Sequence, residues 1–419
     1  TTCRTLSPTG GDDTAAIQAA INACPAGQVV QLGPGDFRIS GEGLVVNRSN
    51  VTLRGSGAGT RLLKVDQRRS PYPVVIVGNR WSSDKFASSV NLAANGTRGS
   101  RTVTLASAPV PPLSVGEIVL LDQLTNPELT WWSSRSPPGD SSRGWFSRHD
   151  RPITQMAEVE VVNGATVTFT TPLHVDFLTA YAAQLSRYGP GRVLPATKLS
   201  GIEDLYLEGG AGGDGGGNVH FFVCAYCWVK NVESAHSLGT SVNLDGCFRC
   251  EVRDSFIHTS DNPSPGGDGY LVGVNFGSAD NLIENNIVWN GNKVILMRAS
   301  GGGNVVGYNY MEDGFGEGYK SIPEVGLNAS HMTTAHMELF EGNQAWNFGT
   351  DSVWGNAIYI TAFRNHLTGL RRSLGGLGLT DTDGRYAVAV GDHHWWYTFV
   401  GNVLGTEGQV LLPGQTAFA

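Results

Sequence analysis

A short phrase recurs five times between residues 281 and 402. Each copy consists of an apolar residue, two further residues and an asparagine, usually within a run of β-branched or aromatic residues. The copies are Ile283-Glu-Asn-Asn286, Val306-Gly-Tyr-Asn309, Phe340-Glu-Gly-Asn343, Ala362-Phe-Arg-Asn365 and Phe399-Val-Gly-Asn402. Their asparagines lie 23, 34, 22 and 37 residues apart, so the shortest period is 22 to 23 residues. A unit of this length is one coil of a repeat, because it is too short to bury a core of its own.

A repeat of this period, with strand-like runs broken by Gly, Asn, Asp and Ser, is typical of a parallel β-solenoid. Its coils stack at about the 4.8 Å spacing of paired strands and share one long core. An asparagine at the same place in every coil can then hydrogen-bond to the asparagines above and below it. The alternative is that each asparagine only makes a turn. Five copies in register favour the ladder.

The first forty residues predict a helix followed by two strands. Ile17, Ala20 and Ile21 keep the spacing of three and four residues that marks one face of a helix. The following run, Val29-Val-Gln-Leu-Gly-Pro-Gly-Asp-Phe-Arg-Ile39, reads as strand, turn and strand. A helix at this place would cover the open end of a solenoid, whose unpaired backbone would otherwise pair with other chains.

The two runs GDDTAAIQAAI and VVQLGPGDFRI resemble the N-terminal cap and first coil of the pectate-lyase-like right-handed parallel β-helix superfamily. That superfamily includes polygalacturonase-type hydrolases, β-1,3-glucanases, polysaccharide lyases, epimerases and phage tailspikes. The resemblance covers residues 10–65 and, through the coil repeats, residues 195–405. It implies an all-β fold, a right-handed parallel β-helix (solenoid) with an N-terminal helical cap. Its members share a scaffold and not one chemistry, so the reaction must be argued from the site.

The coil pattern stops between residues 66 and 196, where hairpin-like strands predict an inserted small antiparallel β subdomain. We therefore expect three parts: residues 1–65 with the cap and first coils, the insert at 66–196, and the main helix at 197–419. A loop of the insert carries Trp131, Trp132 and Trp145 among Ser, Pro, Gly and Arg residues. Aromatic faces in a polar loop suit sugar rings, so we expect them to bind substrate. The alternative is that they hold the insert against the helix.

Six cysteines form three candidate pairs. Cys3 and Cys24 flank the predicted first helix, and the Cys224/Cys227 motif recurs 23 residues later as Cys247/Cys250. One coil of offset stacks each cysteine on its mate at a separation that a disulfide accepts. The rival interpretation is a structural zinc site, since two Cys-x-x-Cys motifs at such spacing also bind zinc. We favour disulfides, because the coil period explains the spacing without a metal.

Composition narrows the partners and the compartment. The net charge is −8 and no Lys/Arg run is present, so nucleic acid is an unexpected partner. No apolar run is long enough to span a bilayer. The chain begins Thr1-Thr2-Cys3 without Met, and we expect a secreted or periplasmic protein whose leader has been removed. We predict a polysaccharide or oligosaccharide as substrate, no cofactor or metal in the active site, and either a monomer or an oligomer of unknown size.

The resemblance implies that substrate lies along the outer face of one stacked sheet. Candidate catalytic residues on successive coils of that face, with one loop residue, are Asp245, Asp268, Arg298, His331 and Asp351. Candidate substrate-binding residues beside them are Tyr270, Asn275, Lys293 and Trp354.

Two reactions can use this set. Hydrolysis needs two carboxylates about 5 to 9.5 Å apart, and Asp245 with Asp268, or Asp268 with Asp351, could form such a pair. A polysaccharide lyase instead needs a base and, next to it, a cation or an arginine that neutralises a uronic acid carboxylate. The residues that could serve are Arg298, Lys293, His331 and Tyr270. Acidic residues outnumber candidate bases in the loops, so the sequence favours a glycoside hydrolase. A non-catalytic glycan-binding or tailspike-like solenoid is the third class.

Overall fold

The computed structural model describes most of the chain. The described residues are 1–66, 72–80, 86–135, 148, 150–188, 196–211, 217–262, 269–314, 325–351, 353–369 and 386–407. None of the helices within these ranges has the length and the hydropathy to span a bilayer.

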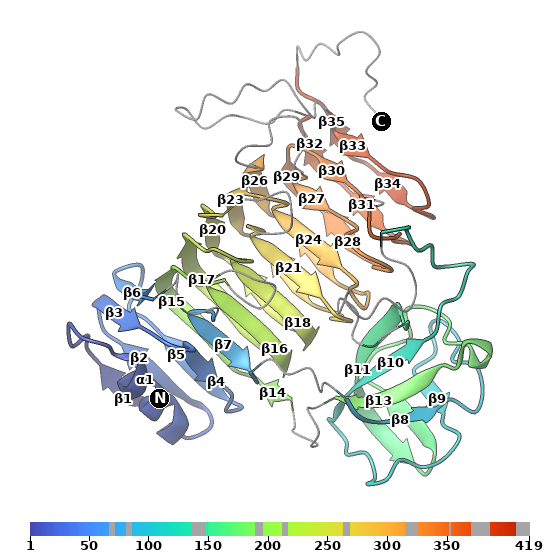
Figure 1. The fold of residues 1–419 in the computed structure, drawn as a ribbon, viewed down its shortest axis with the longest axis horizontal. Coiled ribbons are helices and arrows are strands. Elements are labelled where there is room, and N and C mark those ends of the chain that lie inside the picture. Colours follow the sequence, from blue (N-terminus) through green and yellow to red (C-terminus); the bar gives the residue numbers. More distant parts are fainter. Residues whose placement is uncertain are drawn as a thin grey trace.

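The chain winds into a solenoid with three strands in each coil (Figure 1). One coil consists of β18 (Val242–Phe248), β19 (Glu251–Arg253) and β20 (Phe256–His258), and the next begins with β21 (Val272–Asn275). β21 pairs in parallel with β18, so each strand lies beside its counterpart one coil away. We call the three stacks the first, second and third sheets, in the order in which the chain passes through them.

The strands of each sheet follow one another along the solenoid axis. The first sheet contains β4 (Leu44–Val46), β7 (Val75–Gly78), β14 (Thr197–Lys198), β16 (Val219–Ala225), β18, β21, β24 (Ile295–Arg298), β27 (Leu327–Asn328), β30 (Phe348–Gly349) and β33 (Val388–Ala389). The second contains β1 (Thr2–Leu6), β2 (Gln28–Leu32), β5 (Val51–Arg54), β15 (Gly201–Glu208), β17 (Trp228–Ala235), β19, β22 (Leu282–Glu284), β25 (Val305–Gly307), β28 (Leu339–Glu341), β31 (Thr361–Phe363) and β34 (Thr398–Val400). The third contains β3 (Gly35–Ile39), β6 (Thr60–Lys64), β20, β23 (Ile287–Gly291), β26 (Tyr310–Gly314), β29 (Gln344–Ala345), β32 (His366–Leu367) and β35 (Val403–Leu404). β15 and β17 pass through both the second and third sheets and join them.

The core is one continuous column of apolar side chains inside the solenoid. In β18, Val242 and Leu244 point into this column, and the alternation of a strand therefore turns Asn243 and Asp245 to the outer face. The same alternation holds along the first sheet and decides which residues line its outer surface.

The asparagine ladder is confirmed. Asn309 accepts hydrogen bonds on Oδ1 from the backbone N–H and the side-chain amide of Asn286, at 3.1 and 2.9 Å. Asn343, Asn365 and Asn402 continue the same pattern one coil at a time. The ladder satisfies polar groups at the bend between the second and third sheets, where no strand pairing does so.

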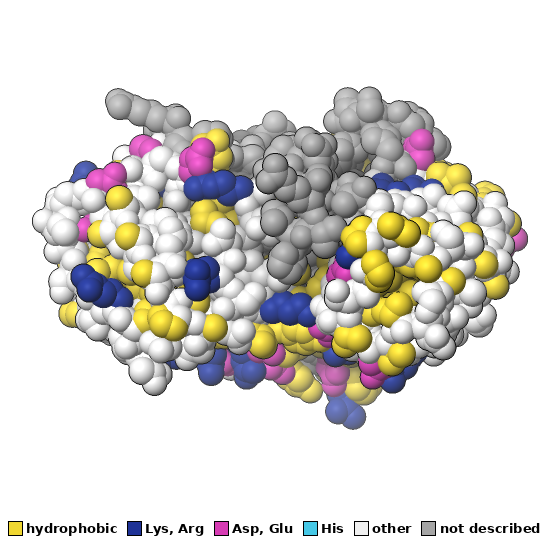
Figure 2. Space-filling model, turned by 90° about the horizontal axis from the view of Figure 1, so that it is seen from below, with side chains coloured by type: hydrophobic (Ala, Val, Ile, Leu, Met, Phe, Trp, Pro, Cys, Tyr) yellow, Lys and Arg dark blue, Asp and Glu magenta, His cyan; other side chains and the backbone are white. Residues whose placement is uncertain are grey.

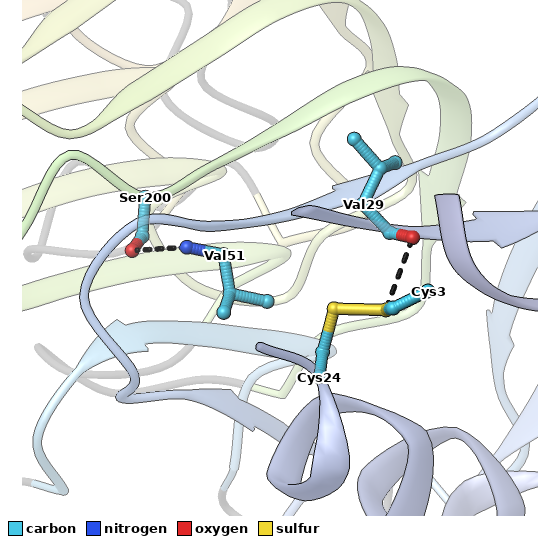
Figure 3. The surroundings of a disulfide bond; sticks show 5 residues. All are labelled: Cys3, Cys24, Val29, Val51 and Ser200. Atoms are coloured by element: carbon cyan, nitrogen blue, oxygen red, sulfur yellow. Dashed lines mark hydrogen bonds between the residues drawn. A yellow bond between two sulfur atoms is a disulfide. The ribbon is translucent and has the colours of Figure 1, made fainter. Parts of the chain in front are cut away.

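The N-terminal helix α1 (Thr14–Ala23) caps the first coils, as the sequence predicts. Ile17 and Ile21 are completely buried against the core column. A disulfide joins Cys3 of β1 to Cys24 at the end of α1 (Figure 3). The disulfide fixes the helix to the second sheet, because Cys3 lies on β1 and β1 pairs with β2 next to Val29.

An antiparallel sheet interrupts the solenoid, again as predicted. Its strands, in spatial order, are β8 (Phe86–Asn91), β13 (Gln184–Tyr188), β10 (Ile118–Gln123), β11 (Ile153–Asn163), β12 (Thr166–Phe169) and β9 (Thr102–Thr104). A short 3-10 helix spans Thr179–Tyr181. β7 precedes this sheet and pairs in parallel with β4 and β16, so the antiparallel strands begin later than residue 66. After the insert the chain rejoins the early coils, where Ser200 Oγ accepts the backbone N–H of Val51 (Figure 3).

The insert packs on the edge of the first sheet. Met156 lies in one buried cluster with Phe222 and Phe248, and its backbone N–H donates to the carbonyl of Gly277 at 3.2 Å. Because of this packing, the insert forms one wall beside the outer face of the first sheet.

Seen from below, the early coils and the insert form two lobes, and Lys and Arg side chains are scattered over both of them (Figure 2).

The two central disulfides favoured by the sequence are absent from the structure, where Cys224, Cys227, Cys247 and Cys250 are buried thiols. The stacking behind that prediction is correct, because Cys224 pairs in register with Cys247. The Sγ atoms of this pair lie 3.7 Å apart, so the sulfurs are in contact without a bond.

Candidate functional site

A row of polar side chains crosses the outer face of the first sheet. It consists of His220 on β16, Asn243 and Asp245 on β18, Asn275 on β21 and Arg298 on β24, and we call it the polar row. Asp245, Asn275 and Arg298 occupy equivalent positions on three successive strands. All five residues are buried although they face outward from the core column.

Hydrogen bonds connect the whole polar row. His220 Nε2 lies 2.8 Å from Asp245 Oδ2, and Asn243 donates to the same oxygen at 3.1 Å. The amide of Asn275 donates to Asp245 Oδ1 at 2.8 Å and accepts from Arg298 Nε on its own oxygen at 2.8 Å. Because every partner is itself held, the Arg298 side chain has a fixed position on the face.

A second group, the His331 cluster, consists of Lys293, His331 and Asp351. Asp351 Oδ2 lies 2.7 Å from His331 Nδ1 and 2.6 Å from Lys293 Nζ. Lys293 comes from the turn before β24, His331 from the segment after β27 and Asp351 from the segment after β30. The solenoid therefore gathers residues separated by up to 58 positions in the chain.

The charges in the His331 cluster determine its protonation. Burial lowers the pKa of His331, and the positive charges of Lys293 and Arg298 act in the same direction against Asp351. Burial by itself raises the pKa of Asp351, but Lys293 and His331 outweigh it and hold that pKa well below its usual range. The cluster at neutral pH is therefore an ionised Asp351 beside a neutral imidazole.

The imidazole is oriented for proton transfer. Asp351 accepts the Nδ1 proton of His331, which leaves the lone pair on Nε2. Within the described part of the chain, Nε2 has no hydrogen-bond partner. Asp351 Oδ1 is also buried without a partner among the described residues. A buried acceptor and a buried base without partners are sites where a ligand can supply the missing hydrogens.

An aromatic ring borders the His331 cluster. The rings of Tyr270 and His331 meet edge to face with centroids 6.0 Å apart. The guanidinium of Arg298 lies 5.5 Å from the ring centroid of Phe276. A face with a phenol, two cations and a neutral imidazole can bind an anionic sugar and move a proton on it.

Two of the predicted catalytic aspartates, Asp245 and Asp351, are far apart. Asp245 lies on β18, whereas Asp351 follows β30, four strands along the first sheet. At about 4.8 Å per strand the separation is roughly 19 Å, beyond the range of a hydrolytic carboxylate pair. Asp268, which belongs to both predicted carboxylate pairs, lies outside the described residues, as does Trp145.

The remaining predicted binding residues contact the protein itself. The Trp131 ring stacks on His393 at 4.0 Å, and its backbone N–H donates to Asn356. Trp132 Nε1 donates to Thr125 of the insert. Trp354 is half-buried next to the same junction, where its carbonyl accepts from Thr333. The Trp131 contacts join the insert to the solenoid, as the alternative for the tryptophans describes, whereas the Trp132 contact stays within the insert. A role in substrate binding stays a prediction.

Sequence reasoning missed three histidine and asparagine residues of this face. His220 precedes Asn243 by 23 residues, so the coil period places them on neighbouring strands and could have identified both. His394, whose Nε2 lies 3.4 Å from Ser330 Oγ, has no such signal, because the coil that contains it has an irregular length. Burial lowers the pKa of His394 to about 4, so it is neutral beside the cluster.

Sequence comparison gives no assignment, since neither a protein-family model nor a curated protein matches the chain. Structural comparison does find similar folds. The tailspike gp61 of Pseudomonas phage phi297 superimposes with a TM-score of 0.57 at 14% identity, covering 94% of this chain and 64% of the tailspike. The tailspike gp49 of Pseudomonas phage LKA1 gives 0.57 at 16% identity, covering 94% and 56%.

An alginate lyase from Paenibacillus sp. str. FPU-7 also superimposes, with a TM-score of 0.50 at 12% identity, covering 96% of each chain. This chain is thus about the size of the lyase and spans less than two thirds of each tailspike. Identities this low carry the fold alone. The parallel sheets, the cap and these superpositions together show that the chain folds as a right-handed parallel β-helix, the fold that the sequence predicts.

Proposed function

We propose that this protein is a carbohydrate-active enzyme that cleaves an extracellular, uronic-acid-containing polysaccharide by β-elimination. The observation that carries the proposal is the convergence of a neutral His331 with Lys293, Arg298 and Asp351 on the outer face of the first sheet. The fold likeness to tailspikes and to an alginate lyase supports a saccharide as the ligand.

The chemistry begins with the substrate carboxylate. In a uronic acid unit the hydrogen on C5 is weakly acidic, and it becomes more acidic when a cation neutralises the carboxylate attached to the same carbon. Lys293, which is partly exposed, and the buried Arg298 supply positive charge for this purpose.

His331 Nε2 then removes the C5 proton. The released electron pair forms the C4=C5 double bond, and the bond between C4 and the glycosidic oxygen breaks. The leaving oxygen takes up a proton, for which Tyr270 is the candidate donor, and the products are an unsaturated sugar and a new reducing end. Asp351 holds the tautomer and balances the charge that His331 acquires.

Hydrolysis, which the sequence favours, receives less support from the described residues. Asp245 is engaged by His220, Asn243 and Asn275, and Asp351 by Lys293 and His331. Each acid is thus paired within its own cluster. Hydrolysis would depend on Asp268, and product analysis separates the two reactions.

The test uses kinetics on polygalacturonate, polymannuronate, polyguluronate and a neutral glucan, read by the ultraviolet absorbance of the new C=C bond. The wild-type protein is expected to act on at least one polyuronate and on no neutral glucan. His331→Gln should lower kcat by about 100-fold or more, the usual contribution of a general base. His258→Gln is the matched control, because His258 lies on β20 in the third sheet.

Three results would overturn the proposal. One is release of reducing ends without the absorbance, which means hydrolysis. Another is equal activity of His331→Gln and His258→Gln. The third is tight binding of a polyuronate without any cleavage, which would make the protein a binding solenoid.

A further inference from the structure

The four buried thiols occupy one corner of the solenoid, between the first and second sheets. Cys224 and Cys247 are in register on β16 and β18, and Cys227 and Cys250 precede the paired residues at the starts of β17 and β19. All four side chains belong to the core column and are completely buried. The two coils thus direct four sulfurs into the same corner.

Both Cys-x-x-Cys turns have the same backbone shape. Tyr226 and Arg249, the residues before the second cysteine, have left-handed φ angles of 56° and 52°. The left-handed residue reverses the chain so that both cysteines of a motif face inward. Two identical turns stacked one coil apart bring the sulfurs of different motifs together.

The separations among three of the four sulfurs match a tetrahedral metal site. Sγ of Cys224 lies 3.7 Å from Sγ of Cys247 and 3.7 Å from Sγ of Cys250. The metal-ligating atoms of Cys224, Cys247 and Cys250 all lie within 4.8 Å of one another. With metal–sulfur bonds of about 2.3 Å, the edge of a tetrahedron of thiolates is roughly 3.8 Å. A disulfide would require about 2.05 Å.

Later coils fill the same corner with a polar ladder. The backbone N–H of Cys250 donates to Asn281, the amide of Asn281 donates to Asn304, and Asn304 donates to Glu338. Each of these residues links one coil to the next through hydrogen bonds. Thiols are weak donors and acceptors, so the cysteines cannot continue that ladder in the same way.

We propose that Cys224, Cys227, Cys247 and Cys250 bind one structural metal ion, with Zn²⁺ as the chemical match for four thiolates. The ion joins the coils of β16 and β18 where the polar ladder ends. The competing explanation is that the thiols are small apolar core residues, which buried cysteines often are. The convergence of the Cys224, Cys247 and Cys250 sulfurs at metal-site distances, with the Cys227 thiol buried in the same corner, favours the ion.

The first experiment measures metal and thiols on the native protein, purified without chelators and passed through gel filtration. We expect about one zinc per chain and four reactive thiols after denaturation in the presence of a chelator. Four thiols without metal would leave a plain thiol core. Fewer than four thiols, with the mass lower by two hydrogens for each bond formed, would mean disulfides. Either of these outcomes overturns the proposal.

A second experiment reports the geometry without relying on a variant that folds. Refolding the wild-type chain with Co²⁺ in place of Zn²⁺ should give the intense sulfur-to-metal charge-transfer and visible bands of tetrahedral cobalt thiolate. Absence of those bands on a folded, cobalt-exposed protein contradicts a four-thiolate site.

Two variants separate metal loss from loss of core packing. Cys247→Ser should lose the bound zinc and lower Tm, and added chelator should have no further effect on it. Val242→Ala removes methyl groups from the same strand and is expected to lower Tm while keeping one zinc per chain. Equal zinc content in the two variants would show that Cys247 is not a ligand.

Discussion

The side chains around His331 determine what this residue can do. Asp351 holds one ring nitrogen, and the buried setting with two nearby cations lowers the pKa of the imidazole. A neutral histidine with one nitrogen held is ready to accept a proton on the other. The proposed reaction therefore makes a prediction about pH that a purely structural role does not make.

We predict that kcat falls on the acid side only below pH 6.5, the ordinary pKa of histidine, because the pKa of His331 is lowered. Lys293→Met removes one of the charges that lower this pKa. Its activity will be weaker, and its acid limb should move to higher pH. The measurement is the pH profile of kcat for both proteins, and a limb that moves to lower pH in the variant contradicts the assignment.

Glu338 gives a pH prediction for stability. Burial raises the pKa of this carboxyl to about 7, although Ser300 and Asn304 donate hydrogen bonds to it. In the unfolded chain it titrates near 4.5, so the unfolded state loses the proton first as pH rises. Stability from this group is therefore fully present below pH 4.5 and decreases between pH 4.5 and 7.

Glu338→Gln should remove that decrease, so Tm of the variant will vary less between pH 4.5 and 7 than Tm of the wild type. Thermal unfolding at several pH values in this window is the measurement. Glu341→Gln, on the outer side of β28, serves as the control. Parallel profiles of wild type and Glu338→Gln would contradict the assigned pKa.

The sequence predicted on which coil each candidate residue lies better than it predicted which side chains are hydrogen-bonded to each other. The coil period placed Asp245, Asn275, Arg298, His331 and Asp351 on successive coils. It could not show that Asp351 pairs with His331, because that contact joins side chains of segments that follow the strands. Such segments have no fixed register, so their geometry depends on the packing of the whole coil.

Among the structural elements, the asparagine ladder makes the clearest energetic prediction. Asn309 accepts two hydrogen bonds from Asn286 and donates to Asn343 and to the carbonyl of Ile283. Asn309→Ala leaves these buried groups unpaired, at about 1–3 kcal/mol for each unsatisfied group. We expect a total loss of roughly 2–4 kcal/mol in the free energy of unfolding, measured by denaturant titration.

Asn22→Ala is the control for the ladder, because Asn22 is exposed on α1 and its side chain accepts from Gln18. The change to alanine at an exposed helix position should be within about 0.5 kcal/mol of neutral. A ladder variant as stable as this control would mean that the asparagines only form turns.

The insert contains a buried ion cluster that should dominate its stability. Asp122 is fully buried and pairs with Arg148 at 2.6 Å and with Arg151 at 2.5 Å. Asp122→Ala leaves two arginines without their acid and should cost about 3–5 kcal/mol. Glu160→Ala breaks an exposed pair with Arg101 and should cost less than about 1 kcal/mol. Urea unfolding of the two variants measures both values, and similar losses would contradict the account.

The hairpin pattern of the sequence predicts that the insert exists. It does not predict how the insert packs against the solenoid. The contacts that seat it on the helix, such as Trp131 with Asn356 and Met156 with Gly277, join segments more than a hundred residues apart. No repeat or motif connects these segments. The sugar-binding role expected for the tryptophans was therefore inferred from composition, and the structure assigns Trp131 a packing contact.

At the scale of the whole molecule, the stacking of coils brings residues that are far apart in the sequence onto one face of the first sheet. Three strands per coil give the first sheet an outer face, and the insert forms a wall beside it. The cap, the ladder and the core column hold the coils in register, so side chains from five successive coils lie along one face. The N-terminal resemblance and the repeat predicted this architecture, because both are encoded locally.

The central claim is that this face removes a proton and breaks a glycosidic bond without adding water. The most direct test is mass spectrometry of the oligosaccharides released from the polyuronate that the protein cleaves. The account predicts products with an unsaturated end, each lighter by one water molecule than the corresponding saturated oligosaccharide. Release of saturated oligosaccharides alone, with no product carrying an unsaturated end, would show that water was added, and would contradict it.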